Sequence, residues 1–124
     1  MTVGVKSYRD LLVWQKAMDL VVASCDVAKR LPQRENYGLM AQIQRPAVSI
    51  PANIAEGHGR KHTGDYLHHL SIARRSLLEL ETHFLIAVRL SHLQPKDIDP
   101  RMARTDEVGR MISGIFQNLR GRTA

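Results

Sequence analysis

Four stretches of the chain place apolar residues three and four positions apart, a spacing that gathers them on one face of an α-helix. In the first stretch these positions are Leu11, Trp14, Met18, Val21, Cys25 and Ala28. Leu31-Pro32 predicts its end, because the residue before a proline is disfavoured in the helical region. In the second stretch they are Leu39, Ile43, Ala47, Ile50 and Ile54. That helix is expected to begin near Asn36-Tyr37 and to stop at Gly57-His58-Gly59.

The third and fourth stretches are equally regular. The third has apolar positions at Tyr66, Leu70, Ala73, Leu77, Leu80, Phe84 and Ala87. We expect Thr63 to be its N-cap and Ser91-His92-Leu93 to mark its end. The fourth stretch has Met102, Thr105, Val108, Ile112, Ile115 and Leu119. Asp99 is its expected N-cap, Pro100 its first helical residue and Gly121 its end.

The four helices and their short connections predict an all-α fold. No segment alternates between polar and apolar residues as a strand does, and no internal repeat is present. Amphipathic helices joined by short loops favour an antiparallel, up-and-down four-helix bundle. We expect a single bundle domain at residues 8–120, a flexible N-terminal arm at 1–7 and a frayed C-terminal tail at 121–124.

Two prolines lie inside the second helix. Pro51 leaves the Ala47 carbonyl without its helical donor, and Pro46 has the same effect one turn earlier. This predicts a bend at Pro51, with the freed carbonyls finding other partners. Ser49 and Asn53 are the nearest side chains that could supply them.

The second helix also carries a second apolar face. On a helical wheel, Met40, Val48, Pro51, Ala52 and Ala55 lie beside the core stripe and leave only a narrow polar sector. Such a helix is expected to be buried on two sides, which favours a homo-oligomer; scattered surface apolar residues are the alternative. The residues assigned to the oligomer interface or to a structural role are Ser49, Pro51, Asn53, Glu56, Ile72 and Ile86.

Composition and charge narrow the function. The chain has 124 residues, 44% hydrophobic and 24% charged, which suits one globular domain. The net charge of +6 favours an acidic partner, with nucleic acid first and an anionic membrane surface second. A basic surface without any nucleic-acid role is the alternative. The lone Cys25, the absence of a signal-peptide pattern and the absence of a membrane-spanning run favour the cytoplasm, with no membrane partner.

The candidate chemistry favours binding over catalysis. Six histidines and five glutamates do not form the Glu-x-x-His motif of di-iron bundles, and Cys25 lies on the expected core stripe. We therefore expect no enzyme activity, no metal and no cofactor. Arginine, which grips phosphate with two donors, supplies 13 of the 18 basic residues. The candidate nucleic-acid-binding residues are Arg45, Arg60, Lys61, Arg74, Arg75, Arg101, Arg104 and Arg110.

Three segments carry a family resemblance. VWQKAMDLV from Val13, QRPAVSIPANIAEGHGR from Gln44 and IARRSLLELETHFLIA from Ile72 resemble the 23S rRNA intervening-sequence proteins, over roughly residues 8–120. The resemblance implies an up-and-down four-helix bundle that forms a homopentamer with a central channel. Pro46 and Arg75 depart from the family pattern, which more commonly has alanine at the first position and a small residue at the second.

A related branch of the family suggests a function. The accessory variability determinants of diversity-generating retroelements resemble this chain in fold and basic charge, and they bind nucleic acid and a reverse transcriptase. The resemblance therefore implies a non-enzymatic, basic, homo-oligomeric accessory protein that binds RNA or DNA without sequence specificity, with a reverse transcriptase as a further expected partner. An oligomeric protein-interaction scaffold with no nucleic-acid role is the alternative.

Overall fold

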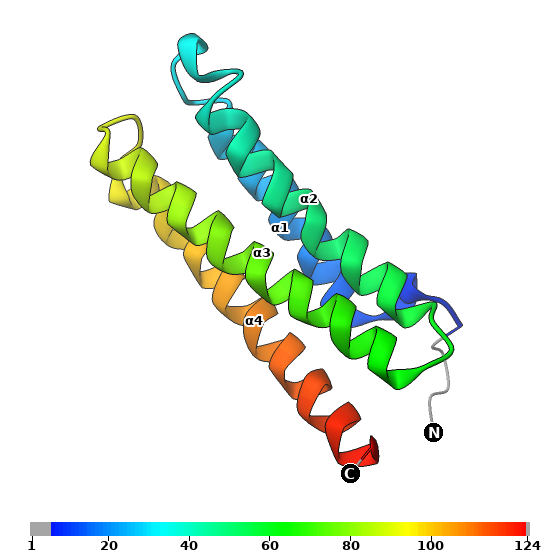
Figure 1. The fold of residues 1–124 in the computed structure, drawn as a ribbon. Helices are drawn as coiled ribbons and strands as arrows, with labels where there is room; N and C mark the ends of the chain where they lie inside the picture. Colours follow the sequence, from blue (N-terminus) through cyan, green and yellow to red (C-terminus); the bar gives the residue numbers. More distant parts are fainter. Residues whose placement is uncertain (1–5, 124) are drawn as a thin grey trace.

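The computed structural model describes residues 6–123, and within them four long helices run antiparallel to their neighbours in sequence (Figure 1). They are α1 (Leu12–Ala28), α2 (Leu39–His58), α3 (Thr63–Arg89) and α4 (Pro95–Thr123), with 3-10 turns η1 (Tyr8–Asp10) and η2 (Gln33–Glu35). No strand occurs between residues 6 and 123, so the predicted all-α, up-and-down bundle is confirmed. Residues 1–5 of the expected arm and Ala124 of the expected tail lie outside the described residues.

The helix boundaries correct three expectations. Thr63 is the first residue of α3, so it is not the N-cap. α4 begins at Pro95, five residues before the expected start at Pro100, which lies inside the helix. The Gln94 N–H donates to the Asp97 carboxylate at 2.8 Å, and this bond stabilises the first turn at Pro95. At its other end α4 continues through Gly121 to Thr123, past the point where the sequence predicted a frayed tail.

The core confirms the apolar stripes of three helices and corrects that of the first. All five predicted positions of α2 are buried, as are six of the seven in α3, with Tyr66 half-buried. On α1 the expected stripe is only partly right: Ala28 is buried and Leu11, Trp14 and Val21 are half-buried against the core, whereas Met18 is exposed. The fully buried residues of α1 are Val13, Ala17, Leu20, Ser24, Val27 and Ala28. α1 is apolar on two faces, so spacing alone did not decide which face the bundle covers.

Both prolines of α2 lie within one continuous helix and are buried. A bend at Pro51 stays a prediction. Asn53, one of the expected partners of the freed Ala47 carbonyl, donates to a different carbonyl. The Asn53 amide donates to the Ser49 carbonyl at 2.9 Å, two residues beyond Ala47.

Gly57 sets a close approach of α2 to α3 near the end of α2. A Cβ atom at Gly57 would lie 2.8 Å from the Cβ of His69 and 2.9 Å from Cδ1 of Tyr66, well inside ordinary carbon contact. The absence of a side chain at this position therefore allows the two backbones to pack closely.

Candidate nucleic-acid interface

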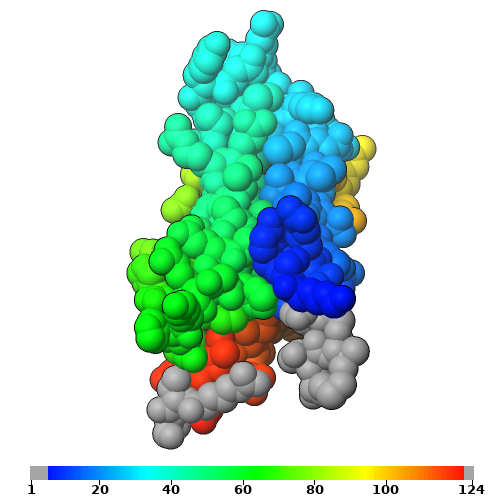
Figure 2. Space-filling model, turned by 90° about the vertical axis from the view of Figure 1, so that its right-hand side faces the viewer, coloured from blue at the N-terminus to red at the C-terminus, as the bar shows by residue number. Residues whose placement is uncertain are grey.

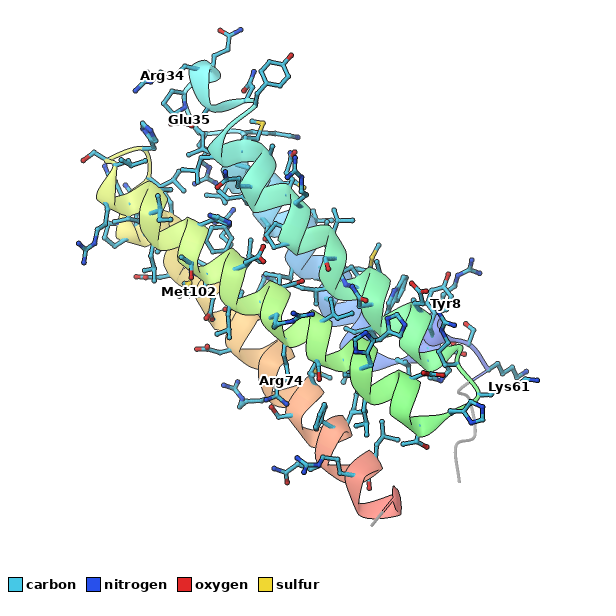
Figure 3. The ribbon with its side chains drawn as sticks, in the orientation of Figure 1. Tyr8, Arg34, Glu35, Lys61, Arg74 and Met102 are labelled. Carbon is cyan, nitrogen blue, oxygen red and sulfur yellow. The ribbon has the colours of Figure 1, made fainter. Side chains whose placement is uncertain are left out.

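A groove between α3 and α4 gathers basic side chains around an aromatic ring. We call it the Phe116 groove; its volume is about 530 Å³. Arg74 and Arg75 line it from α3, and Phe116 and Arg120 line it from α4. The remaining lining side chains are Ser71, Leu78, Ser113 and Gln117, so the groove contains no carboxylate. Figure 3 shows Arg74 partway along α3, on the side where α3 meets α4.

The ring of Phe116 organises two of these arginines. The Arg74 guanidinium carbon lies 5.0 Å from the ring centroid, and that of Arg120 lies 5.8 Å from it. Both distances are within the range of a cation–π contact, in which the electron-rich face of the ring attracts the cation. These contacts hold both guanidinium groups near one point of the groove.

Two adjoining grooves extend the basic surface. The Arg45 groove lies between α2 and α3 and is lined by Arg45, Arg75 and Glu79 among others. The Arg110 groove lies between α3 and α4 and is lined by Arg74, Arg110, Glu81 and Asp106 among others. Arg75 lines both the Arg45 and the Phe116 grooves, and Arg74 lines both grooves of the α3–α4 side. Together, Arg45, Arg74, Arg75, Arg110 and Arg120 form a basic surface across three helices, which we call the arginine band.

The structure brings four predicted nucleic-acid-binding residues together in this band and places the others elsewhere. Arg60 is at the α2–α3 turn, where its guanidinium pairs with the Glu56 carboxylate at 2.8 Å. Lys61 belongs to the same turn, and its side chain extends outward from the bundle (Figure 3). Arg104 is exposed on α4 and does not line any of the three grooves.

Arg101 joins α4 to α1. Its guanidinium donates to the carbonyls of Ala23 and Asp97, at 3.1 and 3.0 Å, and to the carboxylate of Asp26 at 3.0 Å. The side chain is only 13% exposed. All three nitrogens of the guanidinium are used in these bonds. We therefore assign Arg101 a structural role between α4 and α1 and do not include it in the arginine band.

Phe116 and Arg120 were missed by sequence reasoning. Their four-residue spacing on one helix is a signal that was present in the sequence, because residues i and i+4 are neighbours on a helix surface. The contact of Phe116 with Arg74 had no such signal, since it depends on how far α4 is shifted along α3.

The polar residues of α2 face α3 of the same chain. The Ser76 hydroxyl donates to the Ser49 hydroxyl at 2.9 Å, and the Asn53 side-chain oxygen lies 3.0 Å from Nδ1 of His69. The Asn53 amide nitrogen is also 3.0 Å from the Ser49 hydroxyl. These contacts give Ser49 and Asn53 a structural role between α2 and α3.

The other residues assigned to an interface differ in exposure. Pro51 is buried within the chain, whereas Glu56 is exposed and pairs with Arg60. Ile72 is half-buried and lines the Arg45 groove, and Ile86 is 40% exposed on α3.

Several large apolar side chains remain uncovered. α1 and α2 lie side by side, as Figure 2 shows, and each keeps exposed apolar residues: Met18 and Val22 on α1 are 39% and 69% exposed, and Val48 on α2 is 53% exposed. α3 adds exposed residues at Leu78, Leu85, Ile86 and Leu90. Cys25, expected in the core, is only half-buried beside this α1 surface. Among the described helices none is long and apolar enough to cross a membrane.

The fold and the arginine band define a basic, antiparallel four-helix bundle. The model of the family described as 23S rRNA-intervening sequence protein matches residues 9–114, so the chain belongs to this family. The crystal structure of a protein with unknown function from the S23 ribosomal protein family of Bacteroides thetaiotaomicron is similar in fold. It superposes with a TM-score of 0.79 at 22% identity, over 85% of this chain and 98% of the other. A search among curated proteins finds no match.

Proposed function

We propose that this protein is a non-enzymatic, homo-oligomeric accessory protein of the cytoplasm that binds RNA or DNA without sequence specificity. The observation that carries the proposal is the arginine band, which gathers five arginines from α2, α3 and α4 on adjoining grooves. Arginine clusters of this kind neutralise backbone phosphates, and this contact is independent of base sequence.

The charge of the band supports an anionic ligand. Three carboxylates, those of Glu79, Glu81 and Asp106, line the same grooves as the five arginines. One oxygen of Glu81 is 2.6 Å from the Thr105 hydroxyl and accepts its hydrogen bond. Within the described part of the chain, Arg45, Arg75 and Arg110 make no ion pair, so their charges are available to a ligand.

We propose a homopentamer as the oligomer and a reverse transcriptase as a further protein partner, following the family resemblance. The exposed apolar side chains of α1 and α2 support self-association, because contiguous apolar surface on a small protein is commonly an interface. Repeating the arginine band around a ring would strengthen its attraction for a polyanion. Light scattering tests the assembly: a mass that stays at the 14.0 kDa of one chain refutes it.

The binding test compares an RNA and a duplex DNA at about 50 mM salt and follows the affinity as salt increases. We expect binding to both, with a steep loss of affinity in salt. Arg45→Glu combined with Arg75→Glu should weaken it strongly. Lys29→Glu combined with Arg34→Glu is the matched control, because both residues are exposed outside the band and the net charge changes equally. No binding of either nucleic acid at low salt would rule out the proposal.

A protein-interaction scaffold is the second candidate function. The exposed Leu78, Leu85 and Leu90 on α3 favour it, because they offer apolar contacts to a partner protein. The scaffold is supported if the protein assembles but binds no nucleic acid, and if Leu85→Ser changes the oligomer mass or a protein partner's binding.

A further inference from the structure

We propose that the Phe116 groove is a binding site for single-stranded nucleic acid, in which Phe116 positions Arg74 and Arg120 for the backbone phosphates. This inference rests on the proposed nucleic-acid function and adds to it the class of strand and the place where the strand binds. Three observations carry it: the shape of the groove, the distribution of charge along it and the geometry of its arginines.

The shape favours one strand over two. Arg74 and Arg75 line the groove from α3 and Arg120 lines it from α4, so positive charge faces its interior from both helices. Its volume of about 530 Å³ is that of a site for a small ligand, comparable to one or two nucleotides. A single strand can lie between the two helices and be neutralised from both. A duplex is too wide to enter and would contact only the outermost side chains.

The charge distribution limits the site to this part of the bundle. The Phe116 groove has no carboxylate in its lining, whereas the Arg110 groove has Glu81 and Asp106 and the Arg45 groove has Glu79. A polyanion is therefore favoured most strongly in the Phe116 groove, whose lining has none of these carboxylates. The Ser71 and Ser113 hydroxyls and the Gln117 amide add neutral hydrogen-bond donors for phosphate or base atoms.

Phe116 acts here as a positioning residue. Its ring already contacts the guanidinium groups of Arg74 and Arg120, at 5.0 and 5.8 Å from the centroid. A guanidinium that rests on a ring loses less freedom when it binds phosphate, so the contact favours binding without adding charge. The ring should thus affect affinity but not the number of phosphates neutralised.

The experiment uses the full chain and labelled oligouridylate or oligothymidylate of about 20 nucleotides, each compared with its duplex of the same length. We expect both single strands to bind about tenfold more tightly than their duplexes. Arg74→Gln should reduce single-strand affinity about tenfold and lower the slope of log K against log salt by about 0.7. Lys29→Gln, at the exposed C-cap that follows α1, is the charge-matched control and should change affinity less than twofold.

Two further variants test the role of the ring. Phe116→Leu should weaken single-strand binding several-fold and leave the salt slope unchanged, because no charge is lost. Arg74→Lys should do the same, since it keeps the charge but loses the planar group that rests on the ring. Arg74 is exposed, so this variant is expected to fold even if Phe116→Leu does not.

The outcomes separate this inference from the proposed function. If nucleic acid binds but the duplex binds as tightly as the single strand, or if the groove variants match the control, the inference is wrong and the proposed function stands. If no nucleic acid binds at low salt, both are wrong.

Discussion

Gly57 offers a sharp test of how α2 and α3 pack. It is buried near the end of α2, and a Cβ there would lie 2.8 Å from the Cβ of His69. Carbon atoms in favourable contact are about 3.5–4.0 Å apart. The Cβ of His69 is fixed by the α3 backbone, so a rotamer change of His69 does not relieve the overlap. Gly57→Ala therefore requires the two helices to separate locally.

Two opposing contributions set the change in the free energy of unfolding for Gly57→Ala. Alanine is more favourable than glycine within a helix by up to about 1 kcal/mol. Overpacking a close helix contact costs about 1–3 kcal/mol. Gly114 on α4 supplies the matched control, because a Cβ there meets nothing within 4 Å and only the favourable term remains. The free energy of unfolding of Gly57→Ala should thus fall below that of Gly114→Ala by about 1–3 kcal/mol.

Urea unfolding followed by circular dichroism measures this difference. Both variants should be studied at one protein concentration, because the stability of an oligomer depends on concentration. If alanine stabilises the protein equally at both positions, the reasoning about the α2–α3 contact is refuted. A larger loss for Gly57→Val than for Gly57→Ala would support it further.

Three other changes give independent tests. Ser91 follows the end of α3 with φ 61°, a left-handed conformation that glycine adopts more easily than other residues. Ser91→Gly should therefore raise the free energy of unfolding, measured by thermal melts, by about 0.5–1 kcal/mol, whereas Ser91→Ala should not raise it. Arg101→Ala should lower it by about 1.5–3 kcal/mol by breaking the bonds to α1, while the salt slope of nucleic-acid binding should not change. The hydrogen bond from the Leu39 N–H lowers the pKa of Glu35 below its ordinary 4.5, and the bond from the Gln94 N–H lowers the pKa of Asp97 below its ordinary 3.8. The ionised Glu35 and Asp97 carboxylates therefore stabilise the fold at pH values above their ordinary pKa values. This stabilisation should be lost as the pH falls from about 4.5 through the lower pKa values of the folded state. Glu35→Gln should make the loss of stability with falling pH smaller, as measured by thermal melts between about pH 6 and 3.

The helices could be predicted from the sequence because each stripe of apolar residues repeats at the period of an α-helix. The prediction was accurate for α2 and α3, whose expected positions are all buried except the half-buried Tyr66. It was only partly right for α1, where Ala28 is buried but Met18, on a second apolar face, is left 39% exposed. The sequence also predicted that α4 begins at Pro100, because Pro95 and Pro100 both suit a first helical turn. The bond from the Gln94 N–H to the Asp97 carboxylate, seen in the structure, supports the start at Pro95.

The candidate site was only partly predictable. Sequence reasoning identified Arg45, Arg74, Arg75 and Arg110 by residue type and included Arg60 and Arg101 for the same reason. It could not know that Arg60 pairs with Glu56 or that Arg101 bonds to α1, because both outcomes depend on side-chain geometry. Ser49 and Asn53 stood out as an unusual polar pair between apolar faces, and their partners on α3 became visible only in the fold.

The sequence by itself determined four amphipathic helices, their antiparallel order, the basic charge and the family. These properties depend on neighbours within a few turns, or on composition, and both can be read along the chain. The tertiary structure decided which face of α1 is buried and which arginines share a groove. These properties depend on the rotation and shift of one helix against another, as when the meeting of α3 and α4 places Arg74 over Phe116.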